Sequence, residues 1–176
     1  MSEFEGVHPA LASALAGRGY EILTPVQKAV IASDLGQADA LVSAQTGSGK
    51  TVAFGLALAE GILGDAEKFA PAERPLALII APTRELAMQV KAELMWLYAG
   101  TGARFASCVG GMDSRSERKM LQFGAHIVVG TPGRLRDHIE KGALDLGALK
   151  AAVLDEADEM LDLGFREDLE FILDSA

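Results

Sequence analysis

The chain has 176 residues, of which 49% are hydrophobic and 23% charged, and its formal net charge is −9. These values exclude an intrinsically disordered protein and predict one globular domain with a buried core. No apolar run is long enough to cross a bilayer, and the N-terminus lacks the pattern of a signal peptide, so we expect no membrane partner. A single cysteine, Cys108, excludes an internal disulfide and leads us to expect a cytoplasmic protein.

The negative charge is concentrated in the last part of the chain. From Asp155 onward there are nine acidic residues and one base, Arg166, so the preceding 154 residues carry a net charge of only −1. The total charge therefore does not exclude nucleic acid, whose phosphates are met by local groups of Lys and Arg. We interpret His8, His126 and His138, which are scattered along the chain, as ordinary surface or strand-end residues rather than metal ligands.

Apolar runs of strand length recur along the chain, and stretches with helical spacing lie between them. Residues 84–98 place their apolar side chains on one helix face, whereas residues 64–75 are predicted to form a surface loop. Continuous apolar strands that alternate with helices predict an α/β fold, in which a parallel β-sheet is flanked by helices on both faces. The predicted strands are residues 39–44, 76–81, 104–109, 126–130 and 151–155.

The segments that follow these strands are polar, charged or rich in glycine. In chain order they read "QTGSGKT", "PTRE", "GGMDSR", "TPGR" and "EADE". In an open parallel sheet, ligands bind outside the carboxyl ends of the strands. We therefore expect the chemistry of the protein to lie along this edge.

The first of these segments, "AQTGSGKT", is similar to a phosphate-binding loop, although Ala44 stands where the usual pattern has its first glycine. Gly47 and Gly49 give the backbone the freedom to surround phosphates with amide groups. Lys50 supplies a positive charge for the β and γ phosphates, and Thr51 a hydroxyl for Mg²⁺. A plain glycine-rich turn is the alternative, and the acidic pair described next argues against it.

The last predicted strand ends at Asp155 and is followed directly by Glu156. An aspartate at a strand tip can hold Mg²⁺ through water, and an adjacent carboxylate can orient or deprotonate an attacking water. A solvated acidic turn would not explain why an apolar strand delivers this pair opposite a phosphate loop. We therefore predict that Lys50, Asp155 and Glu156 are catalytic, with Thr51 and Asp155 at the metal.

The motifs "AQTGSGKT", "PTRELA", "GG", "TPGR" and "DEAD" occur in the order and spacing of one family. The chain resembles the first RecA-like domain of DEAD-box ATP-dependent RNA helicases of superfamily 2, of the bacterial type, over nearly its whole length. Alanine at position 44 is normal in that family. The resemblance implies a RecA-like P-loop NTPase fold, with a Q-motif helical region over residues 1–36 and a P-loop core over residues 37–176. It also implies ATP and Mg²⁺ as cofactors, and ATP hydrolysis coupled to unwinding of RNA duplexes.

The stretch "GYEILTPVQ" resembles the family's Q motif, in which the glutamine, here Gln27, reads the adenine edge. The residues alone predict a helix with Thr24 as its N-cap and Gly36 as its end. The alternative interpretation is that Gln27 is a solvated side chain of this helix. Two departures from the family are Leu23, in place of a proline, and Phe4, which lies closer than the usual upstream aromatic. The implied nucleotide-binding residues are Phe4, Tyr20, Thr24, Gln27, Ala44, Gln45, Thr46, Gly47, Ser48, Gly49, Lys50 and Thr51.

The other strand ends resemble the family's RNA-contacting motifs, which implies contacts to sugar and phosphate without reading of base sequence. Arg115, Arg118, Lys119 and Arg136 extend these motifs as a basic track, or are solvated helix charges. Asp158 is implied to face a second domain. The implied RNA-binding residues are Pro82, Thr83, Arg84, Gly110, Gly111, Thr131, Pro132, Gly133 and Arg134.

The sequence ends at "FILDSA", which we expect to be the end of the single helix that follows "DEAD". In the family, a "SAT" strand and a second RecA-like domain come after this point, so we expect a fragment of a larger enzyme. Alone it is expected to bind nucleotide, to show negligible RNA-stimulated hydrolysis and no unwinding, and, because of unpaired strand edges, to self-associate or to be marginally stable. A free-standing nucleotide-binding module or switch is the alternative, which the RNA-type motifs disfavour.

Overall fold

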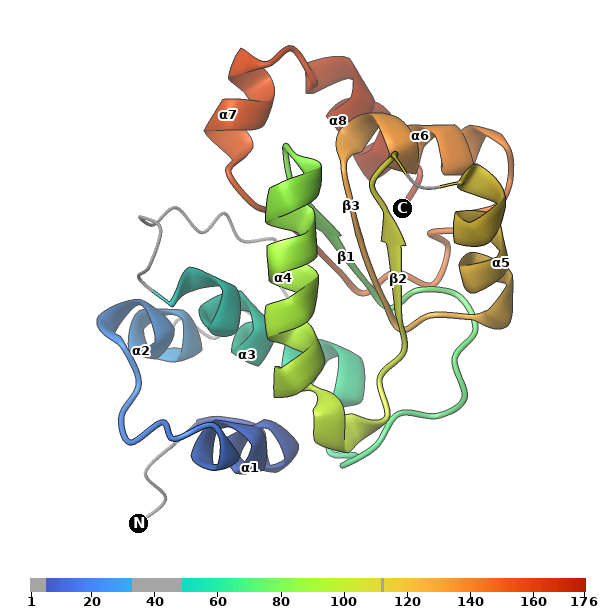
Figure 1. Ribbon diagram of the computed structural model, residues 1–176. Coiled ribbons are helices and arrows are strands. Elements are labelled where there is room, and N and C mark those ends of the chain that lie inside the picture. The colour runs from blue at the N-terminus through green and yellow to red at the C-terminus, as the bar shows by residue number, and fades with distance from the viewer. Residues whose placement is uncertain (1–5, 33–48, 112) are drawn as a thin grey trace.

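Four short parallel strands form the centre of the protein in a computed structural model that describes residues 6–32, 49–111 and 113–176. The strands are β1 (Ala77–Ile80), β2 (Phe105–Cys108), β3 (Ile127–Gly130) and β4 (Ala151–Leu154), and their order in the sheet is β2-β3-β1-β4 (Figure 1). They confirm four of the five predicted strands. The remaining one, residues 39–44, lies outside the described residues.

Helices fill the segments between the strands, and several begin at residues whose side chains cap them. The His8 ring accepts a hydrogen bond from the Ala10 amide at the start of α1, and Thr83 and Asp113 cap α4 and α5 in the same way. The helices are α1 (Pro9–Gly17), α2 (Pro25–Ala32), α3 (Lys50–Leu63), α4 (Arg84–Leu97), the short 3₁₀ helix η1 (Ala99–Thr101), α5 (Ser114–Phe123), α6 (Pro132–Glu140), α7 (Ala157–Asp162) and α8 (Arg166–Asp174).

The sheet is buried on both faces, as the continuous apolar strands predict. Successive residues of a strand point to opposite faces, so Ile79 packs in a core with α1, α3 and α4, whereas Leu78 and Ile80 pack in a second core with α6 and α8. Figure 1 shows α4 to the left of the strands, with α5 to their right and α6 at the upper right. The predicted α/β architecture, a parallel sheet with helices on both faces, is confirmed.

The segment 64–75 is mostly exposed, as expected for a surface loop, but His126 is among the residues that anchor it to the core. The Phe69 ring stacks on the imidazole of His126 with 4.4 Å between ring centroids. His126 Nε2 donates to Ala70 O over 2.8 Å, and its Nδ1 accepts from the Arg104 amide over 2.9 Å. His126 therefore holds this loop against the start of the sheet.

The interpretation of His8 and His138 as ordinary surface residues is wrong. The side chains of all three histidines are at most 9% exposed. His8 is buried because its ring links the start of α1 to the end of α3, where Nε2 lies 3.0 Å from Gly64 O. His138 belongs to a buried cluster described below.

The segment after β4 forms two helices instead of the single helix expected. Helix α7 stops at Asp162, and α8 begins at Arg166 after Gly164, whose φ of +87° lies in the left-handed region that glycine enters readily. This turn allows Met160 of α7 and Ile172 of α8 to enter the same core. Within the described parts of the chain, no helix combines the length and apolar character needed to cross a membrane.

Candidate nucleotide and nucleic-acid site

The carboxyl ends of the strands lie at one level. Ile80 of β1 is in register with Gly130 of β3 and Leu154 of β4. The backbone continues this alignment beyond the strands, because the Asp155 amide donates to Ile80 O over 2.8 Å and the Thr131 amide donates to Cys108 O over 3.0 Å. The motifs that follow the strands are therefore gathered along one edge, as predicted.

Helix α3 begins at Lys50, directly after Gly49 in a left-handed conformation, and it carries the lysine to the predicted acidic pair. Lys50 Nζ lies 2.6 Å from Asp155 Oδ1, and 2.7 Å from Oε1 of Glu156, which is 106 residues away in sequence. Lys50 and Asp155 are 9% and 1% exposed, whereas Glu156 is 35% exposed. The three residues predicted to be catalytic thus form one cluster, which we name the lysine cluster.

The charge of Lys50 is maintained by its acidic partners. Burial by itself lowers the pKa of this ammonium, but contact with the carboxylates of Asp155 and Glu156 outweighs burial and raises the pKa above its ordinary value. Lys50 is therefore a permanent cation at neutral pH. Such a point charge suits the phosphates of a nucleotide.

Glu156 occupies a backbone conformation that side chains rarely adopt. Its φ of +56° and ψ of +51° are left-handed, and among the described residues no other non-glycine residue has a positive φ. This conformation costs on the order of 1–2 kcal/mol for a residue with a Cβ atom. It also lets the chain turn sharply from β4 into α7, so that Asp155 and Glu156 both reach Lys50.

The predicted metal-binding residues fit a hard cation that is held largely through water. Among the described residues, Oδ2 of Asp155 is buried without a hydrogen-bond partner, and Oδ1 has only the ammonium of Lys50 at 2.6 Å. Buried oxygens of this kind are suited to receive hydrogen bonds from the waters around Mg²⁺. Thr51, half-buried in the first turn of α3, follows Lys50 directly. The residues present therefore fit Mg²⁺.

The Q-motif glutamine is buried and bonded to the end of the phosphate loop. Gln27 is 0% exposed, so its interpretation as a solvated helical side chain is wrong. Gln27 Oε1 accepts from the Thr24 amide over 2.9 Å, and Thr24 Oγ1 accepts from the Gln27 amide over 3.3 Å, a reciprocal cap that confirms Thr24 as N-cap. Gln27 Nε2 donates to Gly49 O over 3.3 Å. The start of α2 is thus joined to the residue that precedes Lys50.

Tyr20 and Leu23, which also belong to the Q-motif stretch, pack against other parts of the fold. The Tyr20 ring lies 5.9 Å from that of Trp96 in α4, with Arg18 over the same indole. Partial burial, and then the charge of Glu93, raise the pKa of the Tyr20 hydroxyl. Leu23 is buried in the core beside α1 and α3, which accounts for an aliphatic residue at this position.

Several predicted nucleotide-binding residues fall outside the described part of the chain. These are Phe4, Ala44, Gln45, Thr46, Gly47 and Ser48.

The predicted RNA-binding residues of three motifs meet at the same edge. A Cβ atom added at Gly111 would collide with the guanidinium of Arg84, and one at Gly110 would lie 3.6 Å from Nη2 of Arg134. Both glycines have positive φ, +72° for Gly110 and +69° for Gly111. The turn after β2 is thus compact because glycine allows two arginines from other segments to approach it.

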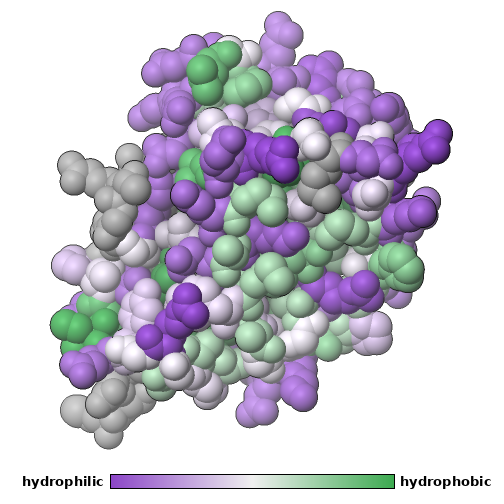
Figure 2. All heavy atoms as spheres, in the orientation of Figure 1, coloured by the Kyte–Doolittle hydropathy of each residue, from purple (hydrophilic) through white to green (hydrophobic). Residues whose placement is uncertain are grey.

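The five other predicted RNA-binding residues lie around helix starts. Thr83 Oγ1 caps α4 by accepting from the Leu86 amide over 3.2 Å. Thr131 precedes α6, Pro132 occupies its first turn, and Gly133 is exposed beside them. Buried Pro82 connects β1 to the Thr83 cap. Figure 2 shows mainly hydrophilic residues around α5 and α6, toward the right of the view.

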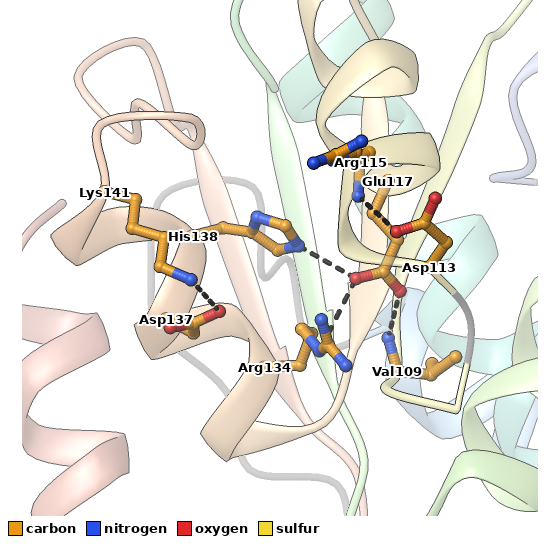
Figure 3. Close-up of polar contacts among 8 residues, drawn as sticks. All are labelled: Val109, Asp113, Arg115, Glu117, Arg134, Asp137, His138 and Lys141. Carbon is orange, nitrogen blue, oxygen red and sulfur yellow. Dashed lines mark hydrogen bonds and ion pairs between the residues drawn. The ribbon is translucent and has the colours of Figure 1, made fainter.

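A buried carboxylate beneath this edge was not identified from the sequence. Glu117, in α5, is 0% exposed, and its Oε2 accepts from the Val109 amide over 2.9 Å (Figure 3). Its Oε1 accepts from His138 Nε2 over 2.8 Å and lies 3.6 Å from Arg134 Nε. We name these four residues the glutamate brace. In the sequence of α5, "SRSERKMLQF", Glu117 is one acidic residue among three basic residues. This pattern gives no indication that its side chain is buried.

The charges of the brace also act on the neighbouring cysteine. Burial, followed by the negative charge of Glu117, raises the pKa of the Cys108 thiol to about 12, against the opposing effect of the positive charge of Arg134. Cys108 therefore stays a thiol at neutral pH, and a buried thiol of this kind is unreactive.

Of the residues in the proposed basic track, Arg136 is already engaged in ion pairs and the other three are exposed. Arg136 Nε lies 2.7 Å from Glu140 Oε1 and its Nη1 lies 3.2 Å from Asp168 Oδ1, with the guanidinium 4.6 Å from the centre of the Phe171 ring. The alternative, an ordinary helix charge, describes Arg136 better because its guanidinium is already engaged. Arg115, Arg118 and Lys119 are exposed on α5.

The DEAD/DEAH box helicase family matches residues 24–176 of the chain. The chain is 42% identical to "DEAD-box ATP-dependent RNA helicase 9" of Oryza sativa subsp. japonica over 170 residues, which cover 96% of this chain and 26% of that protein. It is 44% identical to "ATP-dependent RNA helicase CshA" of Limosilactobacillus reuteri over 170 residues, 96% of this chain and 33% of that protein.

Among solved structures, a DEAD box protein from the hyperthermophile Methanococcus jannaschii superposes with a TM-score of 0.84 at 37% identity, covering 97% of this chain and 45% of that one. The chain thus spans about a quarter to a third of the length of the two curated relatives. The names of these relatives give no support to the alternative of a free-standing nucleotide switch. The parallel sheet flanked by helices, with the motif residues gathered at its carboxyl edge, agrees with these matches. The chain belongs to the DEAD/DEAH box helicase family.

Proposed function

We propose that this domain binds ATP with Mg²⁺ and contacts the RNA backbone, as part of an ATP-dependent RNA helicase that couples ATP hydrolysis to duplex unwinding. The observation that carries the proposal is the lysine cluster, in which Lys50 lies within 2.7 Å of both Asp155 and Glu156 at the strand ends. Membership of the family and the names of the relatives support the same activity.

Lys50 is proposed to exchange its carboxylate partners for the β and γ phosphates of ATP. Phosphate oxygens offer the same charge and hydrogen bonding as the two carboxylates that hold the ammonium now. The exchange releases Glu156 to orient a water for attack and Asp155 to hold the metal with Thr51, largely through water. Mg²⁺, when bound, neutralises charge on the transferred phosphoryl group.

Gln27 is proposed to read the adenine edge with the part of its amide that the protein leaves unused. An amide has two N–H donors and two acceptor lone pairs. One donor is engaged by Gly49 O and one lone pair by the Thr24 amide. One donor and one acceptor remain, which match the adjacent acceptor and donor of adenine and not those of guanine.

For RNA, we propose contacts to sugar and phosphate from the "PTRE", "GG" and "TPGR" segments, with Arg84 and Arg134 supplying charge. Contacts of this kind fix the position of the strand without reading its sequence. Asp158, exposed at the start of α7, is proposed to face a second RecA-like domain. We also propose residues 1–36 as the Q-motif region and residues 37–176 as the P-loop core.

Calorimetry of the 176-residue chain with ATP and GTP, each with Mg²⁺, tests the nucleotide part of the proposal. We expect ATP to bind more tightly than GTP, and Gln27→Ala to reduce the difference. Equal affinity for both nucleotides in the unmutated chain contradicts the role of Gln27, and absence of binding contradicts the phosphate site itself.

Two properties of the chain in isolation stay predictions. We expect negligible RNA-stimulated hydrolysis, because arginine fingers from a second domain contribute about 10³ to 10⁵ in rate in related enzymes. Strand edges that lack a neighbour invite self-association, which light scattering after size exclusion measures. Robust RNA-dependent ATP turnover by a monomer of this chain contradicts the predicted lack of hydrolysis. A chain that stays monomeric at high concentration contradicts the predicted self-association.

A further inference from the structure

We propose that Glu117 is a positioning residue for the RNA contact: it fixes the direction of the Arg134 guanidinium and the position of the turn that contains Gly110 and Gly111. This inference rests on the proposed function, because it assumes that Arg134 and this turn meet the RNA backbone. Glu117 itself is 0% exposed and does not reach the surface.

The carboxylate of Glu117 connects two segments that are distant in sequence. Oε2 accepts from the amide of Val109, the residue immediately before the glycine turn. Oε1 accepts from His138 and lies 3.6 Å from Nε of Arg134, and both of these residues belong to α6 (Figure 3). A single side chain on α5 therefore sets the spacing between the "GG" turn and the start of α6.

Packing alone does not explain a carboxylate at this position. Moving a charge out of water costs several kcal/mol, and an apolar side chain of similar size would fill the space without that cost. The carboxylate is matched instead by two hydrogen-bond donors, a backbone amide and an imidazole, and by the positive charge of a guanidinium 3.6 Å away. A buried acid with this set of partners determines geometry, because each donor has one direction in which its hydrogen lies.

The geometry of Arg134 agrees with a side chain that is held at one end. Its Nε faces the buried Glu117, while the side chain is 23% exposed. Within the described part of the chain, its Nη groups make no hydrogen bond or ion pair, and Nη2 lies near Gly110. An arginine held through Nε retains Nη donors for a phosphate, and the loss of side-chain freedom has already occurred before RNA binds.

The test compares three variants in the 176-residue chain. Glu117→Gln removes the charge and keeps the shape, and Glu117→Asp keeps the charge and shortens the reach. Asp113→Asn is the matched control, because Asp113 caps the same helix on the surface, asparagine caps equally well, and the change of net charge equals that of Glu117→Gln. Circular dichroism and thermal unfolding verify the folded state of each.

The first readout needs no RNA. In ¹⁵N NMR of the free chain, the Nε–Hε signal of Arg134, assigned by its loss in Arg134→Ala, is expected to lie apart from the signals of exposed arginines. Both Glu117 variants are expected to move it toward those signals, and Asp113→Asn to leave it in place. A signal that already lies among the exposed arginines, or that does not respond to Glu117, overturns the positioning role.

The second readout is the affinity for a fluorescein-labelled single-stranded oligouridylate at low salt, measured by anisotropy. We expect Arg134→Ala to weaken binding about tenfold, as for loss of a hydrogen bond to a charged group. Glu117→Gln and Glu117→Asp are expected to weaken it about three- to fivefold, and to have no further effect when combined with Arg134→Ala. Asp113→Asn, which removes a negative charge, is expected to leave binding unchanged or slightly tighter.

The outcomes separate the inference from the proposed function. If Arg134→Ala leaves RNA affinity unchanged, the proposed RNA contact of Arg134 is wrong, and the NMR signal still decides whether Glu117 positions that side chain. If Arg134→Ala weakens binding while Glu117→Gln tightens it as Asp113→Asn does, the RNA contact stands and the positioning role is wrong. In that case Glu117 acts only through its charge.

Discussion

Two groups of charged residues at the same edge of the sheet differ in how completely their bonds are formed. In the lysine cluster, the buried Oδ2 of Asp155 has no partner among the described residues, its Oδ1 has only Lys50, and Glu156 is held in a left-handed conformation. In the glutamate brace, both oxygens of Glu117 accept hydrogen bonds over 2.8 and 2.9 Å. Each group joins carboxylate to base, but in the lysine cluster the unsatisfied atoms belong to the carboxylate and the backbone is strained, whereas in the glutamate brace the carboxylate is satisfied and the atom without a partner among the described residues is Nδ1 of His138.

This difference indicates that side chains of the lysine cluster can exchange partners, whereas the geometry of the glutamate brace is fixed. Unsatisfied polar atoms and strained backbone cost stability, and they persist where a ligand or a reaction makes use of them. A satisfied buried carboxylate resists rearrangement, because every partner left behind is an unpaired polar group. The lysine cluster therefore has the properties of a ligand site, and the glutamate brace those of a support beneath one.

The largest effect is expected from Lys50→Ala. It removes the charge that meets the β and γ phosphates, and we expect the affinity for ATP and ADP to fall by about 100-fold, equivalent to about 3 kcal/mol. Calorimetry measures the affinity, and circular dichroism verifies the fold. Lys28→Ala, which removes an exposed lysine of α2, is the matched control and is expected to bind nucleotide normally. Unchanged affinity in Lys50→Ala, with a native spectrum, contradicts the phosphate-site interpretation.

Removal of a single carboxylate distinguishes the two groups directly. Glu117→Ala leaves an amide and an imidazole without their shared acceptor and a guanidinium without its counter-ion, so we expect the free energy of unfolding to fall by about 3 kcal/mol. Asp155→Ala leaves Lys50 paired with Glu156, so we expect a smaller loss, of about 1 kcal/mol. Urea denaturation measures both. Glu140→Ala, on the surface of α6, is the control for loss of an exposed acid, and equal losses for Glu117→Ala and Asp155→Ala refute the comparison.

The strain at Glu156 is measured by comparing two substitutions that both remove its carboxylate. Glycine accepts a φ of +56° without a steric penalty, whereas alanine retains the Cβ atom that causes it. We expect Glu156→Gly to be more stable than Glu156→Ala by about 1 kcal/mol in urea denaturation. A more stable alanine variant indicates that the turn after β4 is not strained.

The smallest effect is expected from pH in the neutral range. The pKa of Lys50 is raised in the folded protein above its ordinary value of 10.5, so its contribution to stability is fully present below that value. It is lost only as pH rises through the higher pKa of the folded state. The difference in unfolding free energy between the unmutated chain and Lys50→Ala is therefore expected to stay constant from neutral pH up to 10.5, and to shrink above it. Urea titrations across that range measure it, and a decline starting near neutral pH contradicts the pairing.

Local sequence determined much of this protein. Strands β1 to β4 are short apolar runs, and the residues that follow them are covalently bound to the strand ends, so their meeting at one edge follows from a parallel sheet. Lys50, Asp155 and Glu156 were predicted for this reason, and the structure brings them together. The motif order identified the family, because each motif occupies a few consecutive residues.

Tertiary structure alone decided which polar side chains are buried and what they bond. Glu117 and Arg115 lie two positions apart in one helix, yet the former is fully buried beneath the glycine turn and the latter is exposed. Gln27 joins the cap of α2 to Gly49, and Arg136 is engaged by Asp168, contacts between segments 22 and 32 residues apart. Burial and partners of this kind depend on how distant helices pack against the sheet. A local sequence pattern describes one element and carries no information about its neighbours.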